Sequence, residues 1–240
     1  MRDRKYTDEE DRMLKRGREK REHRIPEERM ITRLIPNGPP QALYDIGVGC
    51  YYEFRTLKII YPELRVFGVE PDPEEYADLL PIFGGTLFNC ALGWEHGWRN
   101  FEATGKGKGG GSFYRAHDSR FTTINVEVRT LDDFDSTVGG YQYDKILLWL
   151  DVEDSELDVL EGGKNLLRSG RVEWMNIETR HQNEPGMPTT AKVSAFLADY
   201  GYRPVHRYNV NGEYPEAAGD TVYFKNGVEP LIPAEKGMPF

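Results

Sequence analysis

Short apolar runs alternate with stretches of helical periodicity from Gln41 onward, and this alternation predicts a sheet covered by helices. The clearest strand is expected at Lys145–Val152, because an unbroken apolar run is typical of a strand buried on both faces in the middle of a parallel sheet. The pattern therefore predicts an α/β fold with a doubly wound sheet. The other core strands are expected at Ala42–Ile46, Val66–Val69, Thr86–Cys90, Val172–Glu178, Tyr202–Asn209 and Thr221–Lys225.

Helices are expected between these strands where apolar residues recur with the 3.6-residue period. Leu157, Leu160 and Leu167 fall on one face of such a helix, and Asp154 or Ser155 can cap its first turn. The predicted helices are Cys50–Ile60, Tyr76–Phe83, Ser155–Leu167 and Ala191–Tyr200.

The segment Gly93–Asp144 has weak helical periodicity. Trp98–Glu102 and Thr123–Thr130 are expected to be extra strands around a loop that contains ATGKGKGGGS. The glycines and lysines of this loop could cradle a phosphate, but the loop neither joins a strand to a helix nor places Ser or Thr directly after Lys. A flexible surface loop or lid is therefore the preferred interpretation.

The first 35 residues are rich in charges of both signs and poor in apolar residues, which predicts a charged N-terminal extension, helical or frayed. Pro36, Gly38, Pro39 and Pro40 then mark a boundary. We expect residues 36–240 to form the functional domain.

Composition narrows the class of protein. The chain has 240 residues, 38% of them hydrophobic, which is enough for one substantial core. With 31 Lys and Arg against 40 Asp and Glu, the net charge of -9 disfavours non-specific nucleic-acid binding. The chain shows no apolar membrane span and no signal-peptide core, and Cys50 and Cys90 suggest no disulfide framework or metal cluster. A cytoplasmic protein without membrane partners is the expectation.

A glycine turn follows the first predicted strand. Gly47 and Gly49 let the backbone approach a ligand, and Glu70 ends the next strand near the spacing at which an acidic residue meets a bound ribose. A tight turn followed by a surface Glu is the alternative. A dinucleotide site would place a third glycine where Tyr52 stands. Asp45 instead suits a cationic ligand, which favours S-adenosylmethionine.

Five motifs follow one another along the chain. They are Asp45-Ile-Gly-Val-Gly49, Val69-Glu-Pro-Asp-Pro73, Asn89-Cys-Ala-Leu-Gly93, Val128-Arg-Thr-Leu-Asp-Asp-Phe134 and Leu150-Asp-Val-Glu-Asp-Ser-Glu-Leu-Asp-Val-Leu-Glu-Gly-Gly163. In this order they resemble the FkbM family of methyltransferases. The resemblance covers about Gln41 to Tyr202 and implies a class I, Rossmann-like fold with a mostly parallel sheet and an antiparallel last strand. It also implies O-methylation of sugar or polyketide hydroxyls with S-adenosylmethionine as the cofactor.

The expected cofactor site lies in the crevice at the ends of the strands. Asn89 or nearby backbone would address the adenine there, although Asn89 is equally a turn former. The predicted cofactor-binding residues are Asp45, Gly47, Gly49, Glu70, Asn89, Ala91 and Asp151.

Two departures from the family pattern concern the glycine turn and the fourth strand. In the glycine turn the family commonly has Asn, where this chain has Val48 or Cys50. In the fourth-strand motif the family commonly has Lys, where this chain has Trp149. Either Trp149 is a core residue here or the acceptor pocket has changed.

The carboxylates after the central strand are the first candidates for catalysis. Asp151 and Glu153 could accept the proton of the acceptor hydroxyl, orient it, or together hold a divalent cation through hard oxygen ligands. Capping of the following helix is the alternative role. His181 follows the Val172–Glu178 strand and is a further candidate base, against the usual surface or structural role of a lone histidine. The remaining histidines show no metal-ligand spacing, and metal dependence stays open.

The predicted function is therefore methyl transfer from S-adenosylmethionine to a hydroxyl of a sugar or other small-molecule acceptor. N-methylation, or cofactor binding without transfer, are the alternatives. The acceptor and the oligomeric state are not fixed by the sequence.

Overall fold

A computed structural model of the chain describes residues 39–49, 57–58, 61–105, 110–114, 121–179, 190–209 and 219–228. The predicted extension at residues 1–35 lies outside these ranges. So does the predicted helix Cys50–Ile60, apart from Leu57 and Lys58, which are helical.

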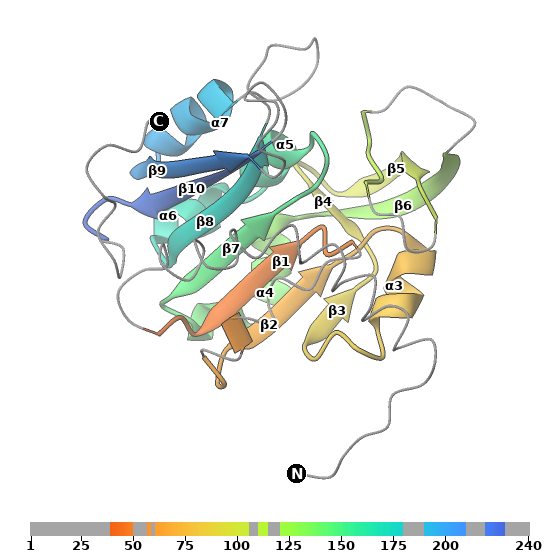
Figure 1. Ribbon diagram of the computed structural model, residues 1–240, viewed down its shortest axis with the longest axis horizontal. Helices are drawn as coiled ribbons and strands as arrows, with labels where there is room; N and C mark the ends of the chain where they lie inside the picture. Colours follow the sequence, from red (N-terminus) through yellow and green to blue (C-terminus); the bar gives the residue numbers. More distant parts are fainter. Residues whose placement is uncertain are drawn as a thin grey trace.

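The large sheet has seven strands in the order β3-β2-β1-β7-β8-β10-β9 (Figure 1). Its strands pair in parallel except β10, which runs antiparallel to both β8 and β9. This order and the single reversed strand confirm the predicted fold class, and β7 lies in the middle as expected. The strands are β1 (Ala42–Ile46), β2 (Arg65–Val69), β3 (Thr86–Phe88), β7 (Ile146–Leu150), β8 (Val172–Thr179), β9 (Tyr202–Asn209) and β10 (Gly219–Lys225).

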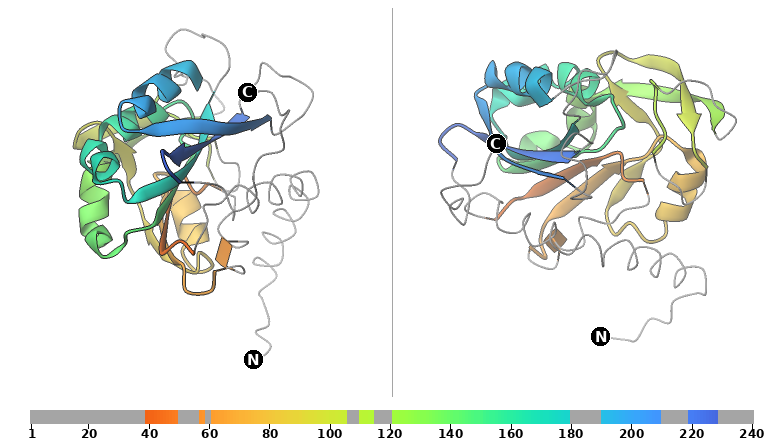
Figure 2. Two further views of the ribbon diagram at one scale, coloured as in Figure 1. Left: turned by 90° about the vertical axis from the view of Figure 1, so that its left-hand side faces the viewer. Right: turned by 45° about the horizontal axis from the view of Figure 1, so that its top comes forward.

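Both faces of the large sheet are covered. Along β7, Leu148 packs into the core beneath the helices, whereas its neighbour Trp149 packs into the core on the opposite face, against Trp174. Trp149 is thus a core residue. No helix of the described ranges is long and apolar enough to cross a membrane. Four helices gather on the first face (Figure 2): α4 (Leu131–Thr137), α5 (Glu156–Glu161), α6 (Lys164–Ser169) and α7 (Thr190–Ala198).

A second sheet of three strands, in the order β4-β6-β5, lies beyond the carboxyl ends of β1 and β7 (Figure 1). It confirms the two extra strands predicted from the sequence. The strand predicted over Thr86–Cys90 is confirmed as β3, but it ends at Phe88, and Ala91 then pairs with Val128 of the second sheet. The strands are β4 (Ala91–Gly93), β5 (Gly97–Ala103) and β6 (Thr122–Thr130).

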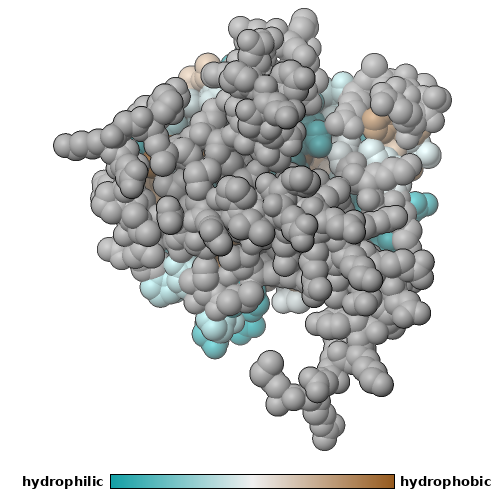
Figure 3. Space-filling view, viewed as in Figure 1, coloured by the Kyte–Doolittle hydropathy of each residue, from teal (hydrophilic) through white to brown (hydrophobic). Residues whose placement is uncertain are grey.

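The second sheet has an apolar inner face and a mixed outer face. Phe101, Ala103 and Val126 are buried, whereas Trp98 of β5 is 68% exposed. Hydrophobic and hydrophilic atoms both reach the surface at this end of the molecule (Figure 3).

Helix α3 (Pro73–Leu79) begins earlier than the Tyr76–Phe83 helix that periodicity predicted. Asp72 caps it by accepting a hydrogen bond from the Glu74 N–H at 2.9 Å, and Pro73 fits the first helical position because its missing N–H would have no partner there.

The predicted helix Ser155–Leu167 is two helices, α5 and α6, separated at Gly162 and Gly163. A Cβ on Gly162 would lie 2.1 Å from the carbonyl oxygen of Gly93, so the interruption lets the helical segment touch β4 closely. The Gly162 carbonyl also leaves the helical pattern and accepts the Asp132 N–H at 3.0 Å. Periodicity alone could not show this contact with a distant strand.

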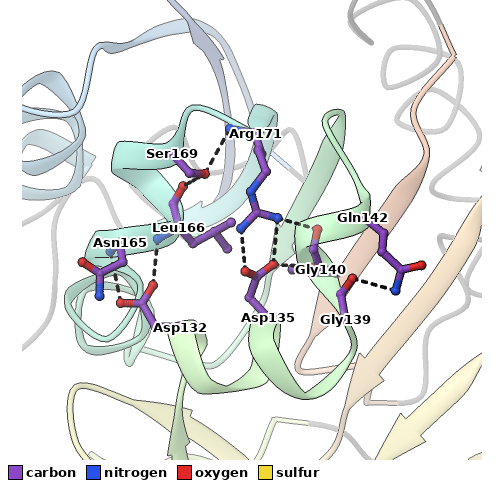
Figure 4. A network of polar contacts seen from close by, with 10 residues as sticks. Asp132, Asp135, Gly139, Gly140, Gln142, Asn165, Leu166, Ser169 and Arg171 are labelled. Atoms are coloured by element: carbon purple, nitrogen blue, oxygen red, sulfur yellow. Dashed lines mark hydrogen bonds and ion pairs between the residues drawn. The ribbon is translucent and has the colours of Figure 1, made fainter.

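Asp132 caps α6 from another helix. Its carboxylate accepts the N–H groups of Leu166 at 2.8 Å and of Asn165 at 3.0 Å (Figure 4). Backbone N–H groups in the first turn of a helix have no acceptor within that helix, so Asp132 supplies the acceptor that these two groups need. Gly163, the residue before α6, has no side chain to supply the cap.

A second polar network in Figure 4 joins α4 to Arg171, the residue before β8. Asp135 and Arg171 form an ion pair at 2.6 Å, and Arg171 also donates to the Gly140 carbonyl. The Tyr44 hydroxyl donates to Asp135 at 2.7 Å. Burial, followed by this carboxylate, raises the pKa of Tyr44, so the phenol remains a hydrogen-bond donor.

We predict that Asp132→Ala lowers the free energy of unfolding by about 1–2 kcal/mol, the usual cost of losing a helix cap. The matched control is Asp133→Ala, which also removes a carboxylate from the first turn of α4 but leaves the cap of α6 in place. Urea unfolding of both variants checks this. Equal losses for the two variants would contradict the capping role.

Candidate active site

The glycine turn after β1 brings three strands together. Gly47 has a φ of +86°, and a Cβ there would lie 1.9 Å from the carbonyl oxygen of Asp151. Its N–H donates to Val69 at 2.9 Å, and the Asp151 N–H donates to Ile46 at 3.0 Å. Glycine at position 47 is thus required for the ends of β1, β2 and β7 to meet at one edge of the sheet.

Glu70 follows β2 and is buried beside this turn. Its carboxylate accepts the Gly49 N–H at 2.8 Å through Oε2 and the Asp72 N–H at 2.8 Å through Oε1. Burial raises the pKa of Glu70 to about 8, although the two N–H donors favour the charged form. Glu70 therefore fixes the glycine turn relative to the start of α3.

Asn89 follows β3 and supports the segment that carries Glu70. Its amide NH2 donates to the carbonyl oxygens of Glu70 at 2.9 Å and Pro71 at 3.2 Å. The side chain holds the backbone that carries Glu70, which agrees with the turn-forming alternative. A contact between Asn89 and adenine stays a prediction.

The loop after β7 has an unusual backbone. Glu153 and Asp154 are consecutive non-glycine residues with positive φ, at 50° and 82°. The buried Glu156 carboxylate holds the loop by accepting the N–H groups of Val152 and Asp154, each at 3.3 Å. Burial raises the pKa of Glu156 to about 8. Asp154 or Ser155 was predicted to cap α5; Ser155 stands at the N-cap position, but its side chain makes no capping hydrogen bond.

These segments surround a cleft with about 730 Å³ of empty space, open solvent at its mouth included. The walls combine apolar surface with several carboxylates. The lining residues are Ile46, Gly47, Gly49, Val69, Glu70, Pro71, Asp72, Glu75, Ala91, Leu92, Phe101, Thr104, Gly110, Gly111, Phe113, Asp151, Val152, Glu153 and Ser155.

The second sheet supplies one wall of the cleft. Phe101 and Phe113 pack edge to face with ring centroids 5.2 Å apart. The segment Gly110–Tyr114, which we call the strap, crosses to the β7 loop, where the Ser112 hydroxyl donates to the Glu153 carbonyl at 2.7 Å. The glycine-rich loop predicted as a lid thus contributes part of a wall, while its residues 106–109 lie outside the described ranges.

The strap is also anchored to α5. Tyr114 donates to the Asp158 carboxylate at 2.5 Å, and the Arg99 guanidinium lies 3.5 Å from the same carboxylate. The Arg99 guanidinium also stacks over the Phe113 ring at 4.5 Å from its centroid. These contacts fix the aromatic wall against the loop that carries Asp151 and Glu153.

Most of the residues predicted to bind the cofactor lie together. The exceptions are Asp45, which is buried within β1 and does not line the cleft, and Asn89, whose amide lies behind Glu70. The candidate base His181 lies outside the described residues. Six predicted site residues line the cleft: Gly47, Gly49, Glu70, Ala91, Asp151 and Glu153.

The sequence analysis missed Asp72, Glu75, Phe101 and Phe113 as cleft residues. The dense acidic run after β2 could have pointed to the first two. No local pattern identifies the phenylalanines, since they reach the cleft through the docking of the second sheet.

Three carboxylates converge at the edge of the cleft. Asp151, Glu153 and Glu178 each offer an oxygen, and these oxygens lie within 4.8 Å of one another. Such a group could hold a metal ion.

A family model described as the methyltransferase FkbM domain matches residues 46–204. The 2-O-methyltransferase NoeI of Sinorhizobium fredii is 29% identical over 181 residues, covering 68% of this chain and 73% of that protein.

Solved structures were also compared. Aeropyrum pernix fibrillarin, crystallised with S-adenosyl-L-methionine, superposes with a TM-score of 0.44 at 14% identity, over 82% of this chain and 73% of that one. The magnesium protoporphyrin IX methyltransferase of Synechocystis PCC 6803 superposes with a TM-score of 0.44 at 10% identity, over 93% and 86% of the two chains.

The raised pKa of Glu70 predicts a pH-dependent stability. Between the ordinary pKa of 4.5 and the folded value of about 8, Glu70 holds a proton in the folded protein but has released it in the unfolded chain. The contribution of Glu70 to the free energy of unfolding therefore decreases as pH rises through this range. We predict that Glu70→Gln flattens this decrease. Urea unfolding from pH 5 to 8.5 measures it, with the exposed Glu63→Gln as the control. Parallel pH profiles for parent and Glu70→Gln would show that Glu70 does not titrate there.

Proposed function

Because this chain belongs to the FkbM methyltransferase family, we propose that it transfers the methyl group of S-adenosylmethionine to a hydroxyl oxygen of a small-molecule acceptor such as a sugar. The observation that carries the proposal is the acidic cleft at the carboxyl ends of β1, β2 and β7, in which the glycine turn and Glu70 are locked together. Ligands of open α/β sheets bind at this edge.

The residues present fit S-adenosylmethionine. Its sulfonium and ammonium groups are cationic, and Glu75, Asp151 and Glu153 give the cleft walls negative charge. Ile46, Val69 and other apolar residues provide surface for the adenosine. Bound there, the cofactor supplies an activated methyl group that needs no further activation by the protein.

Glu70 is the residue we assign to the ribose. Its two oxygens already accept backbone donors, yet each carboxylate oxygen has a second lone pair that can accept a ribose hydroxyl. The backbone bonds hold this carboxylate in place before the ligand arrives, so little side-chain entropy is lost on binding.

Asp151 is the residue we assign to the acceptor. It follows the central strand, lines the cleft, and has its own backbone held by Ile46. Its carboxylate can accept a hydrogen bond from the acceptor hydroxyl, align the oxygen with the methyl group and take the proton as the new bond forms.

The hydroxyl acceptor is supported by the relative and by the cleft. NoeI is a 2-O-methyltransferase, and the walls here pair carboxylates with the Phe101 and Phe113 rings, a combination suited to the polar and apolar faces of a sugar. The same negative charge repels a nucleic-acid backbone. These features favour a small neutral acceptor.

Calorimetry should detect binding of S-adenosylmethionine and S-adenosylhomocysteine but not of nicotinamide dinucleotides. We predict that Glu70→Gln weakens binding of S-adenosylmethionine by about 1–3 kcal/mol, the usual cost of leaving a buried polar group without its hydrogen-bond partner. Glu63→Gln, which removes an exposed carboxylate outside the cleft, should bind like the parent. Tighter binding of a nicotinamide dinucleotide would overturn the cofactor assignment.

Asp151→Asn should reduce single-turnover methyl transfer by roughly 10²-fold or more, because Asn keeps the shape but removes the charge and the proton acceptor. Binding of S-adenosylmethionine should change far less. The measurement uses labelled cofactor and a panel of hydroxyl and amine acceptors, with the exposed Asp199→Asn as the control. Near-parent transfer by Asp151→Asn would move the assignment to His181, and amine products would replace the hydroxyl acceptor.

A further inference from the structure

The three carboxylates at the edge of the cleft form a compact group of oxygen donors. We propose that Asp151, Glu153 and Glu178 bind a divalent cation, and, resting on the proposed function, that this cation holds the acceptor hydroxyl beside the methyl group. The three residues come from separate backbone positions, namely the end of β7, the loop that follows it, and β8.

The distances allow one ion. The carboxylate oxygens lie within 4.8 Å of one another. Oxygen ligands at about 2.1–2.4 Å from an octahedral cation are separated by at most about 4.8 Å, so all three oxygens can reach the same ion. Each residue is half-buried, so water can complete the coordination.

Ser155 provides an independent observation at the same place. Its side chain is 2% exposed, and its hydroxyl has no hydrogen-bond partner among the described residues. Ser155 occupies the N-cap position of α5, but its side chain makes no capping hydrogen bond. The residue lines the same cleft as Asp151 and Glu153. A buried hydroxyl normally has a partner. A water bound to the cation would supply one.

The chemistry of the ligands selects the kind of ion. All three donors are carboxylates, which favour hard cations such as Mg²⁺, Mn²⁺ or Ca²⁺ over ions that prefer nitrogen or sulfur. A divalent cation would offset the charge that the three carboxylates bring to one place.

The ligands are held before the ion binds. Glu156 fixes the loop through Val152 and Asp154, and Ser112 fixes the Glu153 carbonyl. The loop therefore keeps Asp151 and Glu153 on the cleft side.

The cation would act on the acceptor. By binding the hydroxyl oxygen it lowers the pKa of that group, and the proton passes to the second oxygen of Asp151 or to water. The oxygen then forms a bond to the methyl carbon as the carbon–sulfur bond breaks, which gives a methyl ether and S-adenosylhomocysteine. No electron is gained or lost by the ion.

The test is a titration of the full chain with MnCl2, without cofactor or acceptor, followed by the loss of the electron paramagnetic resonance signal of free Mn²⁺. We expect saturable binding of one ion that Mg²⁺ displaces. Asp151→Asn and Glu178→Gln should each weaken Mn²⁺ binding by roughly tenfold or more, and Ser155→Ala by less. Asp199→Asn removes an exposed carboxylate elsewhere and should bind like the parent.

Thermal melts establish that each variant is folded, and Glu178→Gln carries the test if Asp151→Asn does not fold. The absence of saturable binding, or equal Mn²⁺ affinities for Glu178→Gln and Asp199→Asn, would overturn the cation site. Methyl transfer that continues undiminished in EDTA would also overturn it while leaving the proposed function in place. Ion binding without transfer to any acceptor would support the cation site and contradict the proposed function.

Discussion

The contact between Gly47 and the carbonyl oxygen of Asp151 sets the geometry of the whole site. Because no side chain separates them, the end of β1 lies directly against the end of β7, and Val69 of β2 accepts two backbone N–H groups from the same turn. The segment that carries Glu70 and the segment that carries Asp151 therefore face one cleft. A larger residue at position 47 would separate the proposed cofactor-binding and acceptor-binding carboxylates.

Around this contact the protein buries carboxyl groups and gives them backbone N–H donors. Glu70 and Glu156 each accept two N–H groups from neighbouring segments, which replaces part of the water lost on burial. The second pair also stabilises the positive φ angles of Glu153 and Asp154, a conformation that costs energy for non-glycine residues. Glu156, which does not line the cleft, thus holds the loop of Asp151 and Glu153, whereas Glu70 both holds the glycine turn and lines the cleft.

The sequence predicted the parts of the fold that depend on local pattern. The apolar run of β7, the alternating strands and the glycine turn with Glu70 follow from periodicity and from residue type. The break between α5 and α6, the early start of α3 and the docking of the second sheet could not be predicted in the same way. They depend on contacts such as Gly162 with Gly93, or Ser112 with Glu153, which join residues far apart in the chain. For the same reason, Phe101 and Phe113 were missed.

The close packing of Gly162 on β4 also affects how substitution patterns in relatives should be interpreted. This glycine lies outside the lining of the cleft, yet a side chain there would push β4 and the attached aromatic wall away from the loop after β7. Selection on the shape of the acceptor pocket would thus conserve a residue that never meets a ligand. In an alignment, invariance at position 162 would record the packing of this helical segment on the second sheet rather than a step of the chemistry.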